Sequence, residues 1–327
     1  MQKSIVNMCR IVCTLLVIVC VMGPGRVAAQ PAYPDRPIRW VVPWPPGGGA
    51  DLMARIINMK VGEILGQPVV IENRSGAAGN IGTQIGANAE PDGYTMTFGY
   101  SGTLSINPFI YEDTHWRQSD FAPVIFLSKV PLALVVNAEL PVKNVQEFIE
   151  LAKTRQLTFG SSGQGSINHL AGVLFASMTG ANLMHVPYRG GGPALNAVMG
   201  GQVDALFVVP VVVAPQLNGT KLKILGVTSA QRSEILPGVP TIAEAGVPGY
   251  EVSSWNGVMV PAGTPETVIS RLNKAFNEAL DDPKVKKGLV DTGYEIIGGT
   301  PERFTHWVDS ELEKWGPVVK QAGIRSE

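Results

Sequence analysis

Short apolar runs at 40–42, 69–71 and 94–100 alternate with polar loops and with stretches that have helical spacing. Runs of this length, bounded by glycine and proline, predict buried strands, and the periodic stretches between them predict amphipathic helices. Three strand–loop–helix units in succession predict a mainly parallel sheet. Ligand sites in such sheets collect at the carboxyl ends of the strands, where all three glycine-bearing loops would lie.

The loop at 45–51 shows this pattern most clearly. Two prolines end the strand because proline has no N–H to offer a sheet, and the three glycines that follow leave the backbone open to a ligand. Asp51 is expected to cap a helix with apolar positions at Leu52, Ile56, Met59 and Leu65. The helix N-terminus would favour a small organic anion, although a tight turn without a ligand would give the same pattern.

A second series of strands and helices begins after the apolar stretch 121–136, which Pro123 and Pro131 interrupt. We interpret this stretch as strands that leave the first sheet and enter a second one. Asn144, Ser166 and Thr300 are expected to cap helices, and the apolar run 252–260 would return to the first sheet. The predicted fold is therefore α/β with two domains and a ligand cleft between the lobes. Domain 1 would comprise 30–130 plus 250–327, and domain 2 would comprise 131–249.

The N-terminal segment has the pattern of a signal peptide. Lys3 and Arg10 precede the apolar run 11–22, and Val27-Ala28-Ala29 matches a small-residue cleavage site. We expect cleavage near Ala29 and export to the periplasm, with a retained signal anchor as the alternative. All three cysteines lie in this segment, so the exported chain would have no disulfide. The whole chain has a net charge of −1, and cleavage would remove only basic residues, which does not favour nucleic-acid binding.

Catalysis has little support in the sequence. The four histidines (His115, His169, His185 and His306) lack the spacing of metal ligands, and no nucleotide-binding or nucleophile motif is present. No cofactor, metal or catalytic residue is therefore expected, and the chain is predicted not to be an enzyme. The alternative is a secreted α/β hydrolase that uses Ser166 and His169, which are neighbours on a helix, but no third group to orient them can be identified.

Several polar and aromatic residues on the predicted loops are candidates for ligand binding. Arg189 follows a strand and could pair with a carboxylate through two hydrogen bonds. Trp44 and Trp255 could stack on a ligand. His169 is expected in the first turn of its helix, off the apolar face. Each candidate has a structural alternative: a solvated arginine, a core tryptophan or, for His169, a side chain that only holds its loop.

Seven motifs occur in order along the chain from residue 45 to residue 265. They are P-P-G-G-G-A-D at 45–51, Q-P-V-V-I-E-N-R at 67–74, G-A-A-G-N-I-G at 76–82, P-D-G-Y-T at 91–95, H-V-P-Y-R-G-G-G-P-A at 185–194, V-T-S-A-Q-R-S at 227–233 and P-A-G-T-P at 261–265. With these motifs the chain resembles the Bug family, the TctC-like extracytoplasmic solute receptors of tripartite tricarboxylate transporters. The resemblance covers the chain from Tyr33 to the final helix.

The resemblance implies a monomeric Venus-flytrap receptor that closes on a carboxylate and delivers it to a membrane permease. Family members bind di- and tricarboxylates, some amino acids and aromatic acids, and they hold the carboxylate through backbone N–H groups, hydroxyls and water. The implied contacts in the first domain are Pro46, Gly47, Gly48, Asp51 and Ser101. Those in the second domain are Ser161, Gly165, Ser166, His169 and Arg189.

One position departs from the family pattern. Many relatives carry an aspartate directly after the phenylalanine of the strand that here contains Phe207, and such a carboxylate could receive the ammonium group of an amino acid. Val208 and Val209 follow Phe207 in this chain. We therefore expect an apolar pocket around Val208 and no preference for amino acids.

Overall fold

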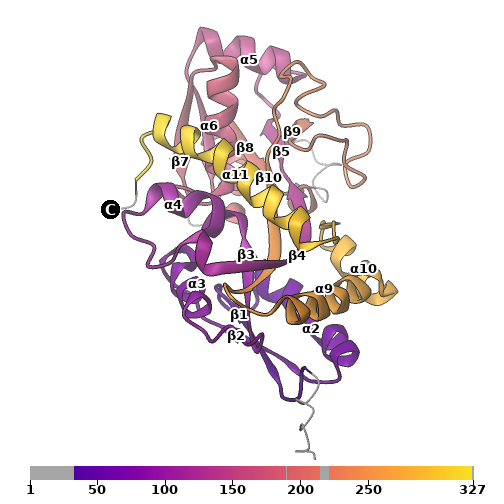
Figure 1. The fold of residues 1–327 in the computed structure, drawn as a ribbon. Helices are drawn as coiled ribbons and strands as arrows, with labels where there is room; N and C mark the ends of the chain where they lie inside the picture. Colours follow the sequence, from indigo (N-terminus) through magenta and orange to yellow (C-terminus); the bar gives the residue numbers. More distant parts are fainter. Residues whose placement is uncertain (1–32, 189, 214–220, 326–327) are drawn as a thin grey trace, which may run out of the picture. The chain divides into compact units, whose positions relative to one another are not determined.

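The computed structural model describes residues 33–188, 190–213 and 221–325 (Figure 1). The predicted signal peptide and Arg189 therefore lie outside the described residues. From residue 36 onward the chain forms one compact unit, and the description that follows concerns this unit. The predicted bounds of the two domains stay a prediction.

The first sheet has six strands in the order β11-β4-β10-β3-β1-β2. β1 pairs in parallel with β2 and β3, as expected, but β10 pairs antiparallel with both β3 and β4, so the sheet is mixed rather than mainly parallel. The antiparallel pairs come from the returning strand β10, which enters the sheet between β3 and β4, and from β11 at the edge of the sheet. The strands are β1 (Ile38–Val42), β2 (Val69–Asn73), β3 (Thr95–Tyr100), β4 (Phe121–Pro131), β10 (Ser253–Pro261) and β11 (Glu295–Ile296).

The second sheet has five strands in the order β7-β6-β8-β5-β9. They are β5 (Ala133–Asn137), β6 (Leu157–Ser161), β7 (Leu183–Pro187), β8 (Ala205–Val208) and β9 (Leu222–Val227). The chain passes from one sheet to the other between Pro131 and Ala133, where proline has no N–H for either ladder. The predicted transfer between two sheets is thus confirmed.

Helices pack around both sheets (Figure 1). They are α2 (Gly49–Leu65), α3 (Asn80–Ala87), α4 (Asn107–Ile110), α5 (Val145–Thr154), α6 (Ile167–Thr179), α7 (Gly191–Met199), α8 (Pro210–Val213), α9 (Glu266–Asp281), α10 (Pro283–Asp291) and α11 (Pro301–Gln321). The predicted caps Asn144, Ser166 and Thr300 are confirmed, since each side chain accepts a backbone N–H of the first turn. Within the described ranges, no helix is long and apolar enough to cross a membrane.

Helix α11 packs against both sheets. Its N-terminal half contributes Phe304 to an apolar cluster with Trp255 of β10, and its C-terminal half contributes Trp315 to the core of the second sheet. Between the two halves, the buried carboxylate of Glu311 accepts hydrogen bonds from the indole N–H groups of Trp255 and Trp315, at 3.1 and 2.9 Å. A single helix therefore ties the two cores together.

The start and the apolar face of α2 differ from the sequence prediction. The N-cap is Gly48 rather than Asp51, and Leu52 and Met59 are 48% and 72% exposed. The helix buries a neighbouring stripe, Met53, Ala54, Ile57 and Val61, together with the predicted Leu65. The prediction was wrong for Leu52 and Met59 because the apolar residues of this helix form two stripes, and the fold buries the other one.

Candidate functional site

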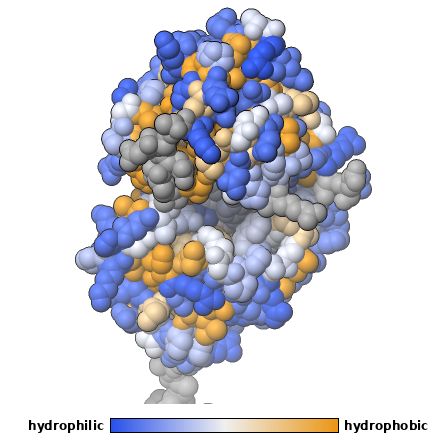
Figure 2. Space-filling model, turned by 180° about the vertical axis from the view of Figure 1, so that it is seen from behind, coloured by the Kyte–Doolittle hydropathy of each residue, from blue (hydrophilic) through white to orange (hydrophobic). Residues whose placement is uncertain are grey.

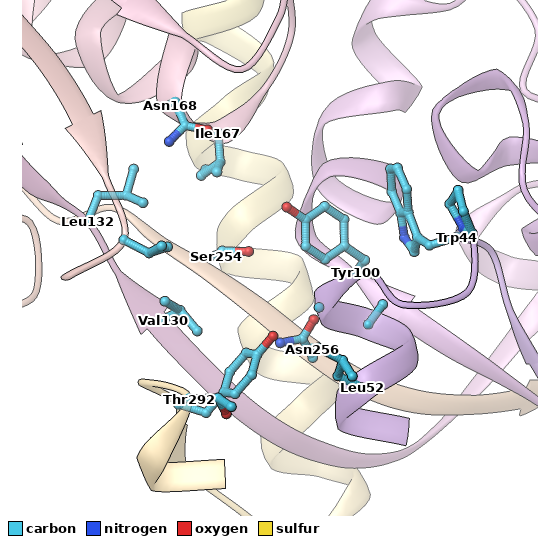
Figure 3. A pocket seen from close by; sticks show the side chains of 16 residues that line it. Trp44, Leu52, Tyr100, Val130, Leu132, Ile167, Asn168, Ser254, Asn256 and Thr292 are labelled. Carbon is cyan, nitrogen blue, oxygen red and sulfur yellow. The ribbon is translucent and has the colours of Figure 1, made fainter. Parts of the chain in front are cut away.

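A cavity of about 490 Å³ lies between elements of the two sheets (Figure 3). The surface is hollowed between the corresponding halves of the molecule (Figure 2). The start of α2 and strands β3, β4 and β10 border it on one side, and the start of α6 borders it on the other. It is lined by Trp44, Pro45, Gly48, Gly49, Ala50, Leu52, Tyr100, Val130, Leu132, Ile167, Asn168, Val209, Ser254, Asn256, Thr292 and Tyr294.

A second cavity of about 670 Å³ adjoins the first. The two share Trp44 and Tyr100, whose rings meet edge to face with centroids 5.4 Å apart, and they share Ile167 and Asn168 at the start of α6. The rest of the second cavity comes from the loop 162–166 and from Ala78, Gly102, Asn107, Ile110, Tyr111 and Arg325. Together the two cavities form one cleft, which we call the binding cleft.

The N-terminus of α2 opens into the first cavity without a side-chain cap. Gly48 is extended, no side chain of the described residues accepts from the first turn, and Gly48, Gly49 and Ala50 line the cavity. The N–H groups of Gly49, Ala50 and Asp51 have no acceptor within the helix because each precedes the first intrahelical bond, from Leu52 to Gly48. This end of the helix offers free donors and the positive end of a dipole.

Asp51 holds the loop rather than facing the cavity. Its carboxylate is 2% exposed and accepts from the Gly47 N–H at 2.8 Å, from Arg55 Nε at 2.9 Å and from Asn73 Nδ2 at 3.0 Å. The hydrogen bond from Arg55 contributes most to lowering the pKa of Asp51 to about 2, against the opposing effect of burial. Pro46 and Gly47 are exposed and do not line either cavity.

In the loop before α6, the side chains of Ser166 and His169 form hydrogen bonds with the backbone of the loop. Ser166 Oγ donates to the Gly163 carbonyl at 2.7 Å and accepts the N–H of His169 at 3.3 Å. The Gly165 N–H donates to His169 Nδ1 at 3.1 Å. Gly165 and Ser166 line the second cavity, so this rigid loop forms one wall of the cleft.

His169 is buried, contrary to its predicted place off the apolar face of the helix. Its ring stacks on His185 with centroids 3.6 Å apart, and His185 Nε2 lies 2.6 Å from Ser161 Oγ. Burial, with a smaller effect of His185, lowers the pKa of His169 to about 3, and burial lowers that of His185 to about 4. Both imidazoles are neutral at pH 7 and serve as hydrogen-bonding parts of the wall.

The arrangement of Ser166 and His169 does not make a nucleophile–base pair. The imidazole Nδ1 accepts from Gly165, and Ser166 Oγ contacts the backbone of His169 rather than its ring. Ser161 is fully buried, with its hydroxyl donating to Gly163. Among the residues that the structure describes, no group of three or more His, Cys, Asp or Glu side chains could hold a metal ion.

Two predicted contacts lie one residue away from the side chains that line the cleft. Trp255 is fully buried, while its neighbours Ser254 and Asn256 line the first cavity from the opposite face of β10. Val208 is likewise buried, and Val209 lines the cavity. Ser101 is also buried, with its Oγ 3.3 Å from that of Ser254. Every residue of β10 is buried, so its sequence gives no sign of which face meets the cleft.

Comparison with known proteins identifies similar chains over nearly the whole length. The family described as tripartite tricarboxylate transporter family receptor matches residues 53–324. A UPF0065 protein in the tcbD-tcbE intergenic region of Pseudomonas sp. strain P51 is 40% identical over 90% of this chain and 88% of its own. Protein BugT of Bordetella pertussis is 35% identical over 98% of this chain and 99% of its own.

Solved structures of similar proteins share the fold. Rpa4515 of R. palustris, solved with adipate, is 38% identical with a TM-score of 0.76 and covers 90% of this chain and 99% of its own. MatC from Rhodopseudomonas palustris, with bound malate, is 32% identical with a TM-score of 0.71 and covers 88% of this chain and 100% of its own. The periplasmic binding protein BugD is 33% identical with a TM-score of 0.73, covering 90% and 100%. These similarities confirm the predicted α/β periplasmic-binding-protein fold of two lobes.

Proposed function

Because the chain belongs to the tripartite tricarboxylate transporter receptor family, we propose that it captures a small organic carboxylate in the binding cleft and delivers it to permease subunits of such a transporter. Its relatives are periplasmic solute-binding proteins and not enzymes. The proposed localisation is accordingly the periplasm, after cleavage of the N-terminal segment near Ala29. The proposed partners are the ligand and the permease.

The observation that carries the proposal is the uncapped N-terminus of α2 at the wall of the first cavity. Its three N–H groups without intrahelical acceptors and the helix dipole suit a carboxylate without a cationic partner. Asp51 does not compete with the ligand, because its carboxylate is turned into the loop and paired there. The ligand carboxylate would thus receive hydrogen bonds from Gly49 and Ala50.

The rest of the cavity suits the carbon skeleton of an organic acid. Apolar side chains contribute much of its lining, namely Leu52, Val130, Leu132, Ile167 and Val209. Such walls would hold the chain of a di- or tricarboxylate or the ring of an aromatic acid. Adipate and malate in two similar proteins support a ligand of this class.

The predicted site residues take different parts in this proposal. Trp44, Gly48, Gly165 and Ser166 would contact the ligand, since they line the cleft. Asp51, Ser101, Ser161, His169, Val208 and Trp255 would position those that do, since they are buried behind it. Arg189 stays a proposed carboxylate contact from the second lobe.

The cleft also supports the proposal that amino acids are poor ligands. Among the described residues that line the two cavities there is no aspartate or glutamate to receive an ammonium group. Val209 occupies the wall near the position where relatives are expected to carry an aspartate. An amino acid would then leave its ammonium group without a partner in a partly desolvated pocket.

A panel of acids tests the proposed function. We expect adipate, malate, citrate or benzoate to raise the melting temperature by mass action, with glutamate and aspartate giving no shift at the same concentration. Isothermal titration should then give the affinity of each acid that shifts it. The proposal fails if no carboxylate of a broad panel binds. Tight binding of glutamate without binding of plain carboxylates would overturn the exclusion of amino acids.

A further inference from the structure

Tyr294 reaches the first cavity from a part of the chain far from the strand-end loops. It follows α10, where Gly293 has φ +87°. The N–H of Gly293 donates to the Val290 carbonyl at 2.9 Å, and that of Tyr294 donates to the Leu289 carbonyl at 3.1 Å. These two bonds form a Schellman motif, which fixes the backbone of Tyr294. β11 begins at the next residue and pairs with β4, so the backbone is fixed on both sides of Tyr294.

The Tyr294 hydroxyl lies against the first turn of α2. A methyl group added at Gly49 would be 3.1 Å from the Tyr294 oxygen, so only glycine leaves this hydroxyl at ordinary contact distance. Gly49, Ala50 and Tyr294 all line the first cavity. The phenol and the free N–H groups of the helix are therefore neighbours on one wall.

Among the described residues this hydroxyl makes no hydrogen bond, and the side chain is partly buried in the cavity wall. Burial, followed by the neighbouring phenol of Tyr100, raises the pKa of Tyr294 to about 12. The oxygen therefore carries its proton at any working pH and can donate it. An unused donor beside three free N–H groups is a further reason to expect an anionic acceptor there.

We propose that Tyr294 is a specificity-determining residue whose hydroxyl donates a hydrogen bond to the ligand carboxylate held at the N-terminus of α2. This inference rests on the proposed function. It adds a hydrogen-bond donor from the C-terminal part of the chain to the ligand contacts that the strand-end loops provide. A neutral donor with a fixed direction would favour a flat carboxylate aligned with the helix over a bulkier anionic group.

The Tyr294→Phe variant tests this contact because it removes only the oxygen. For whichever of adipate and malate binds the wild type, we expect affinity to fall about 10- to 100-fold, as for the loss of a hydrogen bond to a charged group. The melting temperature without acid should stay unchanged, since the hydroxyl has no partner in the part of the chain that the structure describes.

Tyr250→Phe is the matched control. The Tyr250 hydroxyl is buried and donates to the Ala171 carbonyl at 2.9 Å. Its loss should lower the melting temperature without acid and leave the affinity unchanged, the reverse of the result expected for Tyr294→Phe.

Gly49→Ala provides a second, independent test. The added methyl should displace the Tyr294 oxygen and weaken binding, and it should weaken binding less in the Tyr294→Phe background, where that oxygen is absent. Equal losses in both backgrounds would contradict the inference.

The possible failures can be told apart. If adipate or malate binds the wild type and Tyr294→Phe equally well, the inference is overturned and the proposed function stands. A lower melting temperature of the acid-free Tyr294→Phe variant would assign the hydroxyl a structural role and overturn the inference as well. If no acid of the panel binds the wild type, the proposed function fails and the inference fails with it.

Discussion

The loops that precede α2 and α6 form two walls of the cleft, but they treat their hydrogen-bonding groups in opposite ways. Before α6, Ser166 caps the helix, and the Gly165 N–H is bound by His169. Before α2, Gly48 provides no cap, and Asp51 binds the loop from behind. The hydrogen-bonding groups of the second-lobe wall are thus largely paired within the protein, while the first-lobe wall leaves N–H donors for a ligand.

The difference suggests a division of labour between the lobes. The α2 loop would bind the carboxylate that all candidate ligands share, because backbone N–H groups do not depend on the rest of the ligand. The rigid α6 loop would select ligands by shape, because its position is fixed by buried histidines. The predictions below test this contrast, starting with the largest expected effect.

Replacing Asp51 by alanine should strongly destabilise the α2 loop. Three donors would lose their acceptor, two of them on the neighbouring Gly47 and Arg55. We expect a loss of about 3 kcal/mol in the free energy of unfolding, measured by urea denaturation. Asp309→Ala on the exposed face of α11 is the control and should change stability by less than about 0.5 kcal/mol. An Asp51→Ala variant as stable as this control would show that the loop does not depend on Asp51.

Acidification should destabilise the α6 side first. The folded state keeps His169 and His185 neutral, with pKa values of about 3 and about 4, whereas the unfolded chain takes up protons below the ordinary pKa of 6.5. Stability should therefore fall as the pH drops below about 6.5, by about 2 kcal/mol at pH 5 for the more deeply buried His169.

The Asp51 carboxylate is negatively charged where the histidines would be positively charged, and its contribution to stability is lost at a lower pH than theirs. Its pKa is lowered from 3.8 to about 2, so its contribution is present above pH 4 and is lost between about pH 4 and pH 2.

The pH dependence assigned to His169 can be tested with a variant. Urea denaturation at pH 7, 6 and 5 should show a smaller pH dependence in His169→Phe, which keeps a ring but cannot titrate. An unchanged pH dependence in that variant would contradict the assignment to His169.

Ser166→Ala should have the smallest effect on stability, a loss of about 1 kcal/mol, as for other helix N-caps. The variant should also leave any carboxylate bound, though less selectively, because the α6 loop would lose two of its fixed bonds. Thermal unfolding without acid measures the loss of stability, and the shifts with adipate, malate, citrate and benzoate measure the selectivity. A complete loss of binding would place the main carboxylate contact on the second lobe and break the contrast.

Local signals in the sequence predicted the fold well. Asn144, Ser166 and Thr300 cap helices as expected because a cap depends on neighbouring residues alone. The transfer between sheets near Pro131 follows from the missing N–H of proline. What failed was the choice of face: α2 has two apolar stripes, and the sequence of a strand buried on both sides, such as β10, does not show which face meets the cleft.

The candidate site could be predicted only in part, because its members meet through long-range packing. The glycine loop before α2 was found from its composition. Tyr294 was missed because its place depends on the cap of α10 and on the pairing of β11 with β4, which bring it to Gly49 across the fold. The sequence analysis placed His169 on the wrong side of α6, because its stacking partner His185 comes from strand β7, which follows later in the chain.

The most direct test of the carboxylate site is a comparison of backbone amide signals in ¹⁵N NMR during titration with adipate or malate. A carboxylate bound at α2 should shift the amide protons of Gly49 and Ala50 strongly downfield. The amides of Gly165 and His169 should move little, since both are already hydrogen-bonded within the protein. Binding with unchanged Gly49 and Ala50 signals, or with the largest shifts at the α6 loop, would contradict the claim that the uncapped N-terminus of α2 holds the ligand.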